Sequence, residues 1–259
     1  AVDVGSGLGH WTRRVARMLA PGAEVVGVER EPRWVREAAR DGDAGAVRVS
    51  YREGAADALP FDDASVDLVT CQTLLIHIGA PERVLAEMRR ILKPGGTLLA
   101  AEPNNIGGSL AQLACVAGTD VDDLTASVRL EIVCERGKEA LGLGFNSLGE
   151  TLVGLLSPSH WRDTRVWNCD RAYAARAPYP DDALAMLAQE RRWHDEGALL
   201  WPEDETRRYF LAGGGRDDDF PPLWEAVRRV QAQRFRALDD GSYAGACGGL
   251  FYLVAATAS

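Results

Sequence analysis

The chain opens on residues suited to holding a ligand against the backbone. In the stretch AVDVGSGLGHW, three glycines at alternate positions, Gly5, Gly7 and Gly9, follow a short apolar run. Glycine has no Cβ, so it adopts backbone angles that other residues avoid and lets a ligand approach the main chain. A glycine-rich turn after a strand is typical of the first strand-to-helix turn of a nucleotide-binding sheet. The opening therefore predicts a ligand-binding loop.

Two kinds of ligand compete for such a loop. The dinucleotide fingerprint is G-x-G-x-x-G, with its third glycine opening the helix beneath a pyrophosphate. Here His10 occupies that third position, and the glycine comes one residue earlier, at Gly9. Pyrophosphate also prefers a bare helix N-terminus, whereas His10 and Trp11 make a bulky one. The spacing favours a ligand without pyrophosphate, and a glycine turn in an unrelated α/β protein is the alternative that a second motif must exclude.

A second candidate binding residue, Glu29, ends the apolar run EVVGV. A carboxylate at the end of a strand can accept hydrogen bonds from both ribose hydroxyls of an adenosine. A solvated acid at a strand end is the alternative. Because NAD enzymes share this feature, Glu29 supports an adenosine without choosing the cofactor.

The elements that must position these residues alternate regularly over the first hundred positions. Apolar spacing predicts strands and helices in turn. The strands are expected over 1–4, 24–28, 46–51, 66–71 and 97–101, and the helices over 10–19, 32–40 and 80–92. Residues 93–96, Lys-Pro-Gly-Gly, are a helix stop signal. This alternation predicts a parallel, doubly wound sheet whose strand C-termini meet on one edge, where ligands bind.

The rest of the chain departs from this pattern twice. Residues 106–146 and 176–246 are expected to form two helical cap insertions, while 147–175 and 247–259 complete the sheet of the 1–105 core. Within the completing segments we expect a helix over 147–156, a sixth strand over 164–169 and a last strand over 249–255. The second insertion is rich in aromatic residues, most of which should form its core while some wall an apolar substrate site: Tyr179, Trp193, Trp201, Tyr209, Phe210, Phe220 and Trp224.

Three ordered stretches carry a resemblance to a known family. The opening, D-x-G-x-G-x-G from Asp3 to Gly9, resembles motif I of the class I S-adenosylmethionine (SAM)-dependent methyltransferases. REGAADALPFDDASVDLVTCQTLLIHI and ILKPGGTLLAAEPNN resemble later motifs of its ubiquinone/menaquinone methyltransferase-like small-molecule group. A dinucleotide-binding domain has no counterpart for these two. The resemblance implies an α/β, doubly wound, mostly parallel seven-stranded Rossmann-like sheet with its last strand antiparallel, helical cap insertions, and S-adenosyl-L-methionine as cofactor.

The resemblance also implies where the methionine and ribose of SAM bind. Gly5, Gly7 and Gly9 should line the methionine part, with Asp3 fixing their loop. Glu29 should hold the ribose. Because the first residue already lies in what should be a central strand, we expect a preceding segment to help close the cofactor site.

The adenine side departs from the family pattern at one position. Arg30 falls where the family places an adenine-packing side chain, and its flat guanidinium could stack there. The family often carries an Asp just after the glycine of the third-strand loop, but this chain has Ala55 there. Asp57, aided by the backbone of Ala55 and Ala56, is the expected substitute, with a surface loop acid as the alternative.

Methyl transfer from a sulfonium is an in-line displacement, so the protein mainly aligns the nucleophile, and a base is needed only for a protonated nucleophile. Gln72 and Thr73, just past the fourth strand, should face the methionine end and the substrate mouth. His77 is the expected base, because many relatives carry a histidine facing the pocket there; packing between Leu75 and Ile78 is the alternative.

Glu102, at the end of the fifth expected strand, should point toward the ligand edge and orient a substrate cation or act as a base. Catechol-type methyltransferases hold a divalent ion with an acid cluster after the fourth strand, as hard oxygen ligands require. This chain has Cys71 and Gln72 there, so we expect no metal.

Composition limits the partners and the compartment. The net charge of −9 over 259 residues argues against nucleic acid as the main partner, because phosphate binding needs a positive surface. No apolar run approaches the about 20 residues that span a bilayer, and no signal peptide is visible. Five scattered cysteines without C-x-x-C spacing indicate reduced thiols of a cytoplasmic protein. The near-absence of lysine, with only Lys93 and Lys138, is typical of a GC-rich bacterial genome.

The sequence thus predicts a metal-independent, SAM-dependent methyltransferase of bacterial secondary metabolism, acting as a monomer or homodimer. It should move a methyl group to an O or N atom of a small-molecule or peptide-like metabolite. One alternative is C-methylation of an activated ring, with His77 or Glu102 making the carbon nucleophilic. The other is a SAM-binding module without transferase activity.

Overall fold

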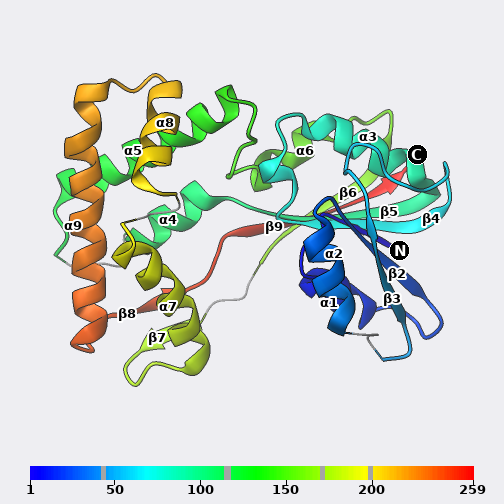
Figure 1. Cartoon of the computed structure of the whole chain (residues 1–259), viewed down its shortest axis with the longest axis horizontal. Helices are drawn as coiled ribbons and strands as arrows, with labels where there is room; N and C mark the ends of the chain where they lie inside the picture. The colour runs from blue at the N-terminus through cyan, green and yellow to red at the C-terminus, as the bar shows by residue number, and fades with distance from the viewer. Residues whose placement is uncertain (42–44, 114–117, 170–172, 198–200) are drawn as a thin grey trace. The chain divides into compact units, whose positions relative to one another are not determined.

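The chain forms two compact units in a computed structural model that describes residues 1–41, 45–113, 118–169, 173–197 and 201–259 (Figure 1). The sheet unit comprises residues 1–103, 148–168 and 251–259. The helical unit comprises residues 104–147 and 169–250. Each unit is therefore assembled from segments that are distant in the sequence.

The sheet unit is built on a seven-stranded sheet in the order β3-β2-β1-β4-β5-β9-β6. Its strands are β1 (Val2–Val4), β2 (Glu24–Glu29), β3 (Arg48–Glu53), β4 (Val66–Gln72), β5 (Leu92–Pro103), β6 (Trp161–Asn168) and β9 (Phe251–Ala258). Strands β1 to β5 pair in parallel, and β9 runs antiparallel to β5 and β6. The predicted doubly wound sheet with an antiparallel last strand is confirmed.

Helices and 3₁₀ turns lie between most of these strands along the chain, whereas β3 and β4 are joined by a loop without a helix. The helices are α1 (His10–Ala16), α2 (Pro32–Ala38), α3 (Pro81–Ile91) and the single-turn α6 (Leu152–Leu155), with short 3₁₀ turns η1 (Ala39–Asp41), η2 (Leu75–His77) and η3 (Gly149–Thr151). Both α2 and α3 begin with proline, whose missing N–H costs nothing there.

Several element ends differ from the sequence prediction. Helix α3 ends at Ile91, and the expected stop signal at 93–96 lies inside β5. Leu92 already has extended backbone angles, and the residue before Pro94 is biased in the same direction, so the chain leaves the helix and pairs with β4 at once. The helix expected over 147–156 is reduced to η3 and α6.

The core of the sheet unit lies on the central strands. Val2, Val4, Val69, Leu98 and Val254 are fully buried. Parallel strands covered on both faces bury side chains of both faces, so they tend to appear in the sequence as apolar runs, as residues 25–28 of β2 do.

The helical unit is formed by both insertions together. Its elements are α4 (Asn105–Leu113), α5 (Val121–Ala140), α7 (Asp181–Asp195), α8 (Glu203–Ala212), η4 (Asp217–Asp219), α9 (Phe220–Asp239), and the strands β7 (Tyr173–Arg176) and β8 (Ala244–Cys247). Aromatic residues of the second insertion pack on α5 of the first, in a cluster of Leu130, Cys134, Tyr209, Phe210, Phe220, Leu223, Trp224 and Val227. The two insertions therefore share one hydrophobic core.

The antiparallel pair β7–β8 was not expected from the sequence. The segments YAAR and AGAC are rich in alanine and glycine, which have little β-propensity, and they show no apolar alternation. The strands form where Ala175 is buried with Leu187 and Tyr243 in a small second cluster.

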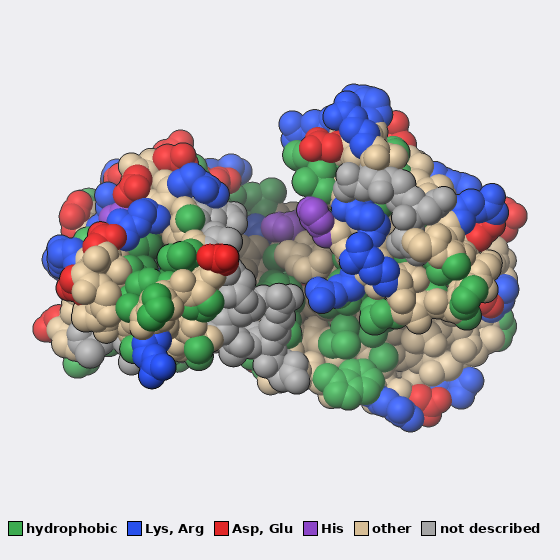
Figure 2. All heavy atoms as spheres, turned by 90° about the horizontal axis from the view of Figure 1, so that it is seen from below, with side chains coloured by type: hydrophobic (Ala, Val, Ile, Leu, Met, Phe, Trp, Pro, Cys, Tyr) green, Lys and Arg blue, Asp and Glu red, His purple; other side chains and the backbone are tan. Residues whose placement is uncertain are grey.

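The surface carries charges of both signs. Acidic and basic side chains are interspersed on each unit in the face that Figure 2 shows. Within the described ranges, no helix has the length and apolar character needed to cross a bilayer.

Candidate active site

The residues singled out in the sequence meet at the C-terminal edge of the parallel strands. The strand order reverses between β1 and β4, and ligands of open α/β sheets bind outside the strand ends at such a point. Backbone bonds join the loops along this edge. Gly54 N–H donates to Glu29 O at 3.0 Å, and Thr73 N–H donates to Ala101 O at 2.9 Å.

The loop of residues 5–9, called here the glycine loop, needs its glycines for two different reasons. Gly5, Gly7 and Gly9 all have positive φ, at 72°, 50° and 78°, a region in which other residues are strained. A Cβ at Gly5 would lie 2.6 Å from Cδ1 of Leu74, and one at Gly9 would collide with Tyr51. A Cβ at Gly7 would meet no protein atom within 4 Å. A side chain at Gly5 or Gly9 would therefore force Leu74 or Tyr51 to shift, whereas Gly7 faces open space.

The Glu29 carboxylate is joined to the glycine loop. Oε2 of Glu29 accepts a 3.0 Å hydrogen bond from the N–H of Gly7, and Oε1 accepts one of 3.0 Å from the N–H of Glu31. Each carboxylate oxygen has two lone pairs, so both can still accept from a ligand hydroxyl. The half-buried carboxylate is thus held at the end of β2 with acceptor capacity to spare.

Asp3 lies beneath the loop and is only 1% exposed. Its Oδ2 accepts a 2.6 Å hydrogen bond from the hydroxyl of Thr12, which ties β1 to α1. Burial raises the pKa of Asp3 from its ordinary 3.8 to about 7. Among the described residues, neither Oδ1 of Asp3 nor the buried hydroxyl of Ser6 in the loop has a hydrogen-bond partner.

The residues expected on the adenine side follow two paired strand ends. Glu29 of β2 pairs with Glu53 of β3, so Arg30 and the 54–57 segment continue from neighbouring positions. Arg30 and Asp57 are exposed, and Ala56 is half-buried. The N–H of Ala58 donates to the carbonyl of Ala55 at 3.2 Å, which closes a turn that presents Ala56 and Asp57 at its tip.

The loop of residues 72–77, called here the post-β4 loop, begins with a strained residue. Thr73 has φ of 53°, an outlier for a β-branched residue, of a kind that clusters at functional sites. The amide of Gln72 donates to the Thr73 hydroxyl at 3.3 Å, and both side chains are half-buried. His77 ends η2 with an exposed side chain, while Leu75 is fully buried.

The side chain of Glu102 is buried and does not point toward the ligand edge as expected. It has no exposed surface, and Oε1 accepts hydrogen bonds from the N–H groups of Leu74 (3.0 Å) and Leu75 (2.9 Å). Burial raises its pKa to about 7. The carboxylate lies inside the sheet unit and holds the post-β4 loop, which corrects the expectation that it points toward a substrate. A position at the end of a strand predicts that a residue lies at the edge of the sheet, but it does not predict whether its side chain points to solvent or into the protein.

Some residues of the site were missed in the sequence. Tyr51 of β3 lies against Gly9 and against Gly27 of β2, and its hydroxyl accepts from Arg13 at 3.2 Å. Gly27 inside a strand was the available signal, because such a glycine often marks a close approach. Nothing local signalled Thr12 or Leu74. In the described part of the chain, no three His, Cys, Asp or Glu side chains are grouped to hold a metal ion.

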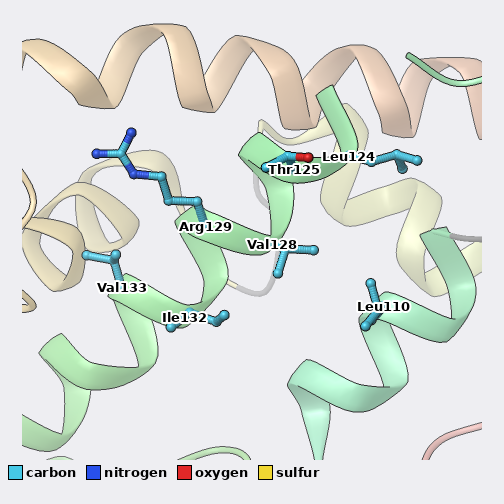
Figure 3. A pocket seen from close by; sticks show the side chains of 7 residues that line it. All are labelled: Leu110, Leu124, Thr125, Val128, Arg129, Ile132 and Val133. Carbon is cyan, nitrogen blue, oxygen red and sulfur yellow. The ribbon is translucent and has the colours of Figure 1, made fainter. Parts of the chain in front are cut away.

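The helical unit contains an apolar hollow of its own, with a volume of about 480 Å³ (Figure 3). Its lining comes from α4 and α5: Leu110, Leu124, Thr125, Val128, Arg129, Ile132 and Val133. Leu110 and Val128 point into the space between the two helices, whereas the guanidinium of Arg129 points away from it and pairs with Asp219 at 3.1 Å. Of the aromatic residues expected to wall a substrate site, Trp193 has a side chain outside the described part, and the others do not line this hollow.

Comparisons with known proteins agree with this geometry. A methyltransferase domain family matches residues 2–100. Demethylmenaquinone methyltransferase of Thermus thermophilus is 38% identical over 104 residues, which are 39% of this chain and 46% of that protein. Ubiquinone biosynthesis O-methyltransferase of Xanthomonas oryzae is 32% identical over 111 residues, 42% of this chain and 45% of that protein. The chain spans less than half the length of these curated relatives.

The solved structures extend the likeness to the fold. The YcgJ protein of Bacillus subtilis superimposes with a TM-score of 0.50 at 16% identity, covering 99% of this chain and 90% of that one. The parallel strands β1 to β4, the glycine loop and the matched family all fall on the first hundred residues. Residues 2–100 therefore match a methyltransferase domain family and lie on a Rossmann-like sheet.

Proposed function

We propose that the chain binds SAM at the edge formed by β1 to β4 and transfers its methyl group to an O or N atom of a small-molecule or peptide-like acceptor. The observation that carries the proposal is the hydrogen bond from the N–H of Gly7 to Glu29, together with the open space in the Cβ direction of Gly7. It places a bare stretch of backbone beside a carboxylate at the switch point of the sheet. SAM has an amino-acid tail, which would lie along the exposed backbone, and a ribose, whose hydroxyls would donate to the carboxylate.

The donors and acceptors of this edge fit that cofactor. Glu29 can accept from ribose hydroxyls, and Ser6 offers a buried hydroxyl for which the described residues supply no partner. Buried polar groups in native structures are nearly always satisfied, by protein, water or ligand. When bound, SAM would supply an electrophilic methyl group on its sulfonium. The open space at Gly7 would take the chain that joins the sulfonium to the amino acid.

The remaining binding roles follow from position. The glycine loop of Gly5, Gly7 and Gly9 would line the methionine part, with Asp3 holding the loop from below through Thr12. Arg30 and Asp57, with the backbone of Ala56, would face the adenine, since they continue from the paired ends of β2 and β3. Gln72 and Thr73 would lie at the methionine end, where β4 ends beside β1.

We further propose that His77 is the base that takes a proton from the acceptor. Its side chain is exposed at the end of η2, on the loop that follows β4, so it can exchange protons with solvent after each turnover. Only the neutral imidazole accepts a proton, so the neutral form of His77 would be the base. An acceptor amine that arrives unprotonated would need alignment alone.

The atom that is methylated is proposed from the relatives. One of them is an O-methyltransferase by name, which supports oxygen; transfer to nitrogen or carbon would appear in the test as a different product. The acceptor is proposed to be small because nothing in the composition provides the basic surface that nucleic acid needs.

Calorimetry with SAM and S-adenosylhomocysteine (SAH) tests binding, and turnover with SAM labelled in its methyl group tests transfer. We expect both ligands to bind and label to appear in an acceptor. Binding without transfer to any acceptor would favour a SAM-binding module. Failure of both ligands to bind would refute the proposal.

A further inference from the structure

We propose that Glu102 is a positioning residue of this site: it holds the post-β4 loop and, through the side chain of Leu74, the glycine loop in the shape that binds SAM. This inference rests on the proposed function. It assigns no chemical step to Glu102, because the carboxylate has no exposed surface from which to reach a substrate.

The first observation is the set of bonds made by one carboxylate oxygen. Oε1 of Glu102 accepts from the N–H groups of Leu74 and Leu75 at 3.0 and 2.9 Å, and the thiol of Cys71 lies 3.8 Å away. These N–H groups stand at the start of η2, where a helical turn leaves its donors without partners in the turn itself. Without Glu102 they would be left unsatisfied in the protein interior, which is costly.

The second observation is that the post-β4 loop contains a strained residue, Thr73, with hydrogen bonds that fix the backbone around it. Thr73 keeps a positive φ of 53° between two anchors: its own N–H is bonded to Ala101 O, and the next two N–H groups are bonded to Glu102. Strained backbone persists only where its surroundings over-determine it. Both anchors come from the end of β5, so this strand end sets the shape of the post-β4 loop.

The third observation connects that loop to the cofactor loop. Leu74 gives its N–H to Glu102, and its side chain lies so close to Gly5 that a Cβ there would be 2.6 Å from Cδ1. A shift of the Leu74 backbone therefore moves the side chain that packs on the glycine loop. Glu102 acts on the glycine loop through this one residue.

The test compares Glu102→Ala, Glu102→Gln and Glu102→Asp with the control Glu135→Ala. Glu135 is matched because it is also fully buried and its carboxylate accepts a 2.7 Å bond from the backbone N–H of Asn146, but it lies in the helical unit. Gln keeps an oxygen that can accept from both N–H groups, whereas Ala removes it and Asp is one methylene too short. Amide hydrogen exchange of Leu74 and Leu75, SAH affinity by calorimetry and thermal melting are measured for each variant.

We expect Glu102→Ala to expose both amides to exchange and to weaken SAH binding about tenfold or more, the scale of a lost hydrogen bond to a charged group. Glu102→Gln should keep both protections and bind SAH within about threefold of the wild type. Glu135→Ala should lower the melting temperature with SAH affinity unchanged. That pattern separates positioning of the site from a general loss of stability.

Two results would overturn the inference. One is a folded Glu102→Ala that binds SAH as the wild type does; the other is an equal loss of affinity in Glu102→Ala and Glu135→Ala. If Glu102→Ala does not fold, Glu102→Asp decides: amides that exchange freely with an unchanged SAH affinity in that variant would refute positioning. A wild type that binds no SAH refutes the proposed function instead, while amide exchange still shows whether Glu102 holds the loop.

Discussion

The backbone N–H of Gly7 donates a 3.0 Å hydrogen bond to Oε2 of Glu29, 22 residues later in the chain. The glycine loop and the acid of the next strand, which the sequence assigns to different parts of the cofactor, are therefore one structural unit. The carboxylate is already oriented, which would lower the cost of ordering it if it holds a ribose as proposed. Changes at either residue should affect the same binding event.

Gly7→Val should abolish SAM binding and leave the chain folded. A Cβ at Gly7 meets no protein atom within 4 Å, so the only cost to the fold is the strain of its positive φ. Gly22→Val is the matched control, since Gly22 also has positive φ and an open Cβ direction but lies in the turn before β2. Calorimetry with SAH should show binding in the control alone; equal affinities would mean that the loop holds something else.

Glu29→Ala should weaken SAM binding by roughly 1.5–3 kcal/mol, the range for hydrogen bonds to a charged group. The loss has two sources, because the carboxylate would bind ribose and also holds the N–H of Gly7. Glu24→Ala, at the other end of β2, removes an exposed acid from the same strand and should not change the affinity. A dissociation constant that is unchanged in Glu29→Ala would refute the ribose assignment.

His77→Ala should lower kcat by roughly 10²–10⁴-fold if the residue is a general base, with little change in SAM affinity. Because the side chain is exposed, the melting temperature should stay within a degree or two of the wild type, about what a surface substitution gives. His160→Ala, at another exposed histidine of the sheet unit, serves as control. Retained turnover in His77→Ala would refute the assignment of His77 as the base, but it would not refute the methyltransferase proposal.

Asp3→Asn should make thermal stability less dependent on pH. The pKa of Asp3 is raised by burial from 3.8 in the unfolded chain to about 7 in the folded one. Between these values the unfolded state releases a proton that the folded state keeps, so the stability from protonated Asp3 is complete below about pH 4 and is lost as the pH rises to 7. Asparagine does not titrate in this range, so the variant lacks this contribution to the pH dependence of stability.

Melting curves of the wild type and Asp3→Asn between pH 4 and 8 provide the measurement. The wild type should lose more stability than the variant over this interval, by more than about 1 kcal/mol. The other acids whose pKa is raised by burial to about 7, Glu102, Glu135 and the half-buried Glu131, are present in both proteins and cancel in the difference. Parallel curves would show that Asp3 is already ionised in the folded state.

The sequence by itself determined the sheet and the likeness of residues 2–100 to a methyltransferase domain. Alternating strands and helices are recognisable because buried parallel strands are apolar on both faces and helices repeat every 3.6 residues. The glycine loop is recognisable because positive φ requires glycine at those positions. Both signals are local, so Gly5, Gly7, Gly9 and Glu29 could be singled out without a structure.

Only the tertiary structure decided how distant residues serve the site. Glu102 was placed correctly at a strand end, but its burial under Leu74 and Leu75 depends on the way two loops pack, and no spacing in the sequence encodes that. The same holds for Leu74 against Gly5 and for Asp3 beneath Thr12. It also holds for the two insertions, whose shared core joins α5 to α8 and α9 across about 70 to 100 residues. Side-chain direction and long-range packing are set when the chain collapses, because many weak contacts then choose one arrangement together.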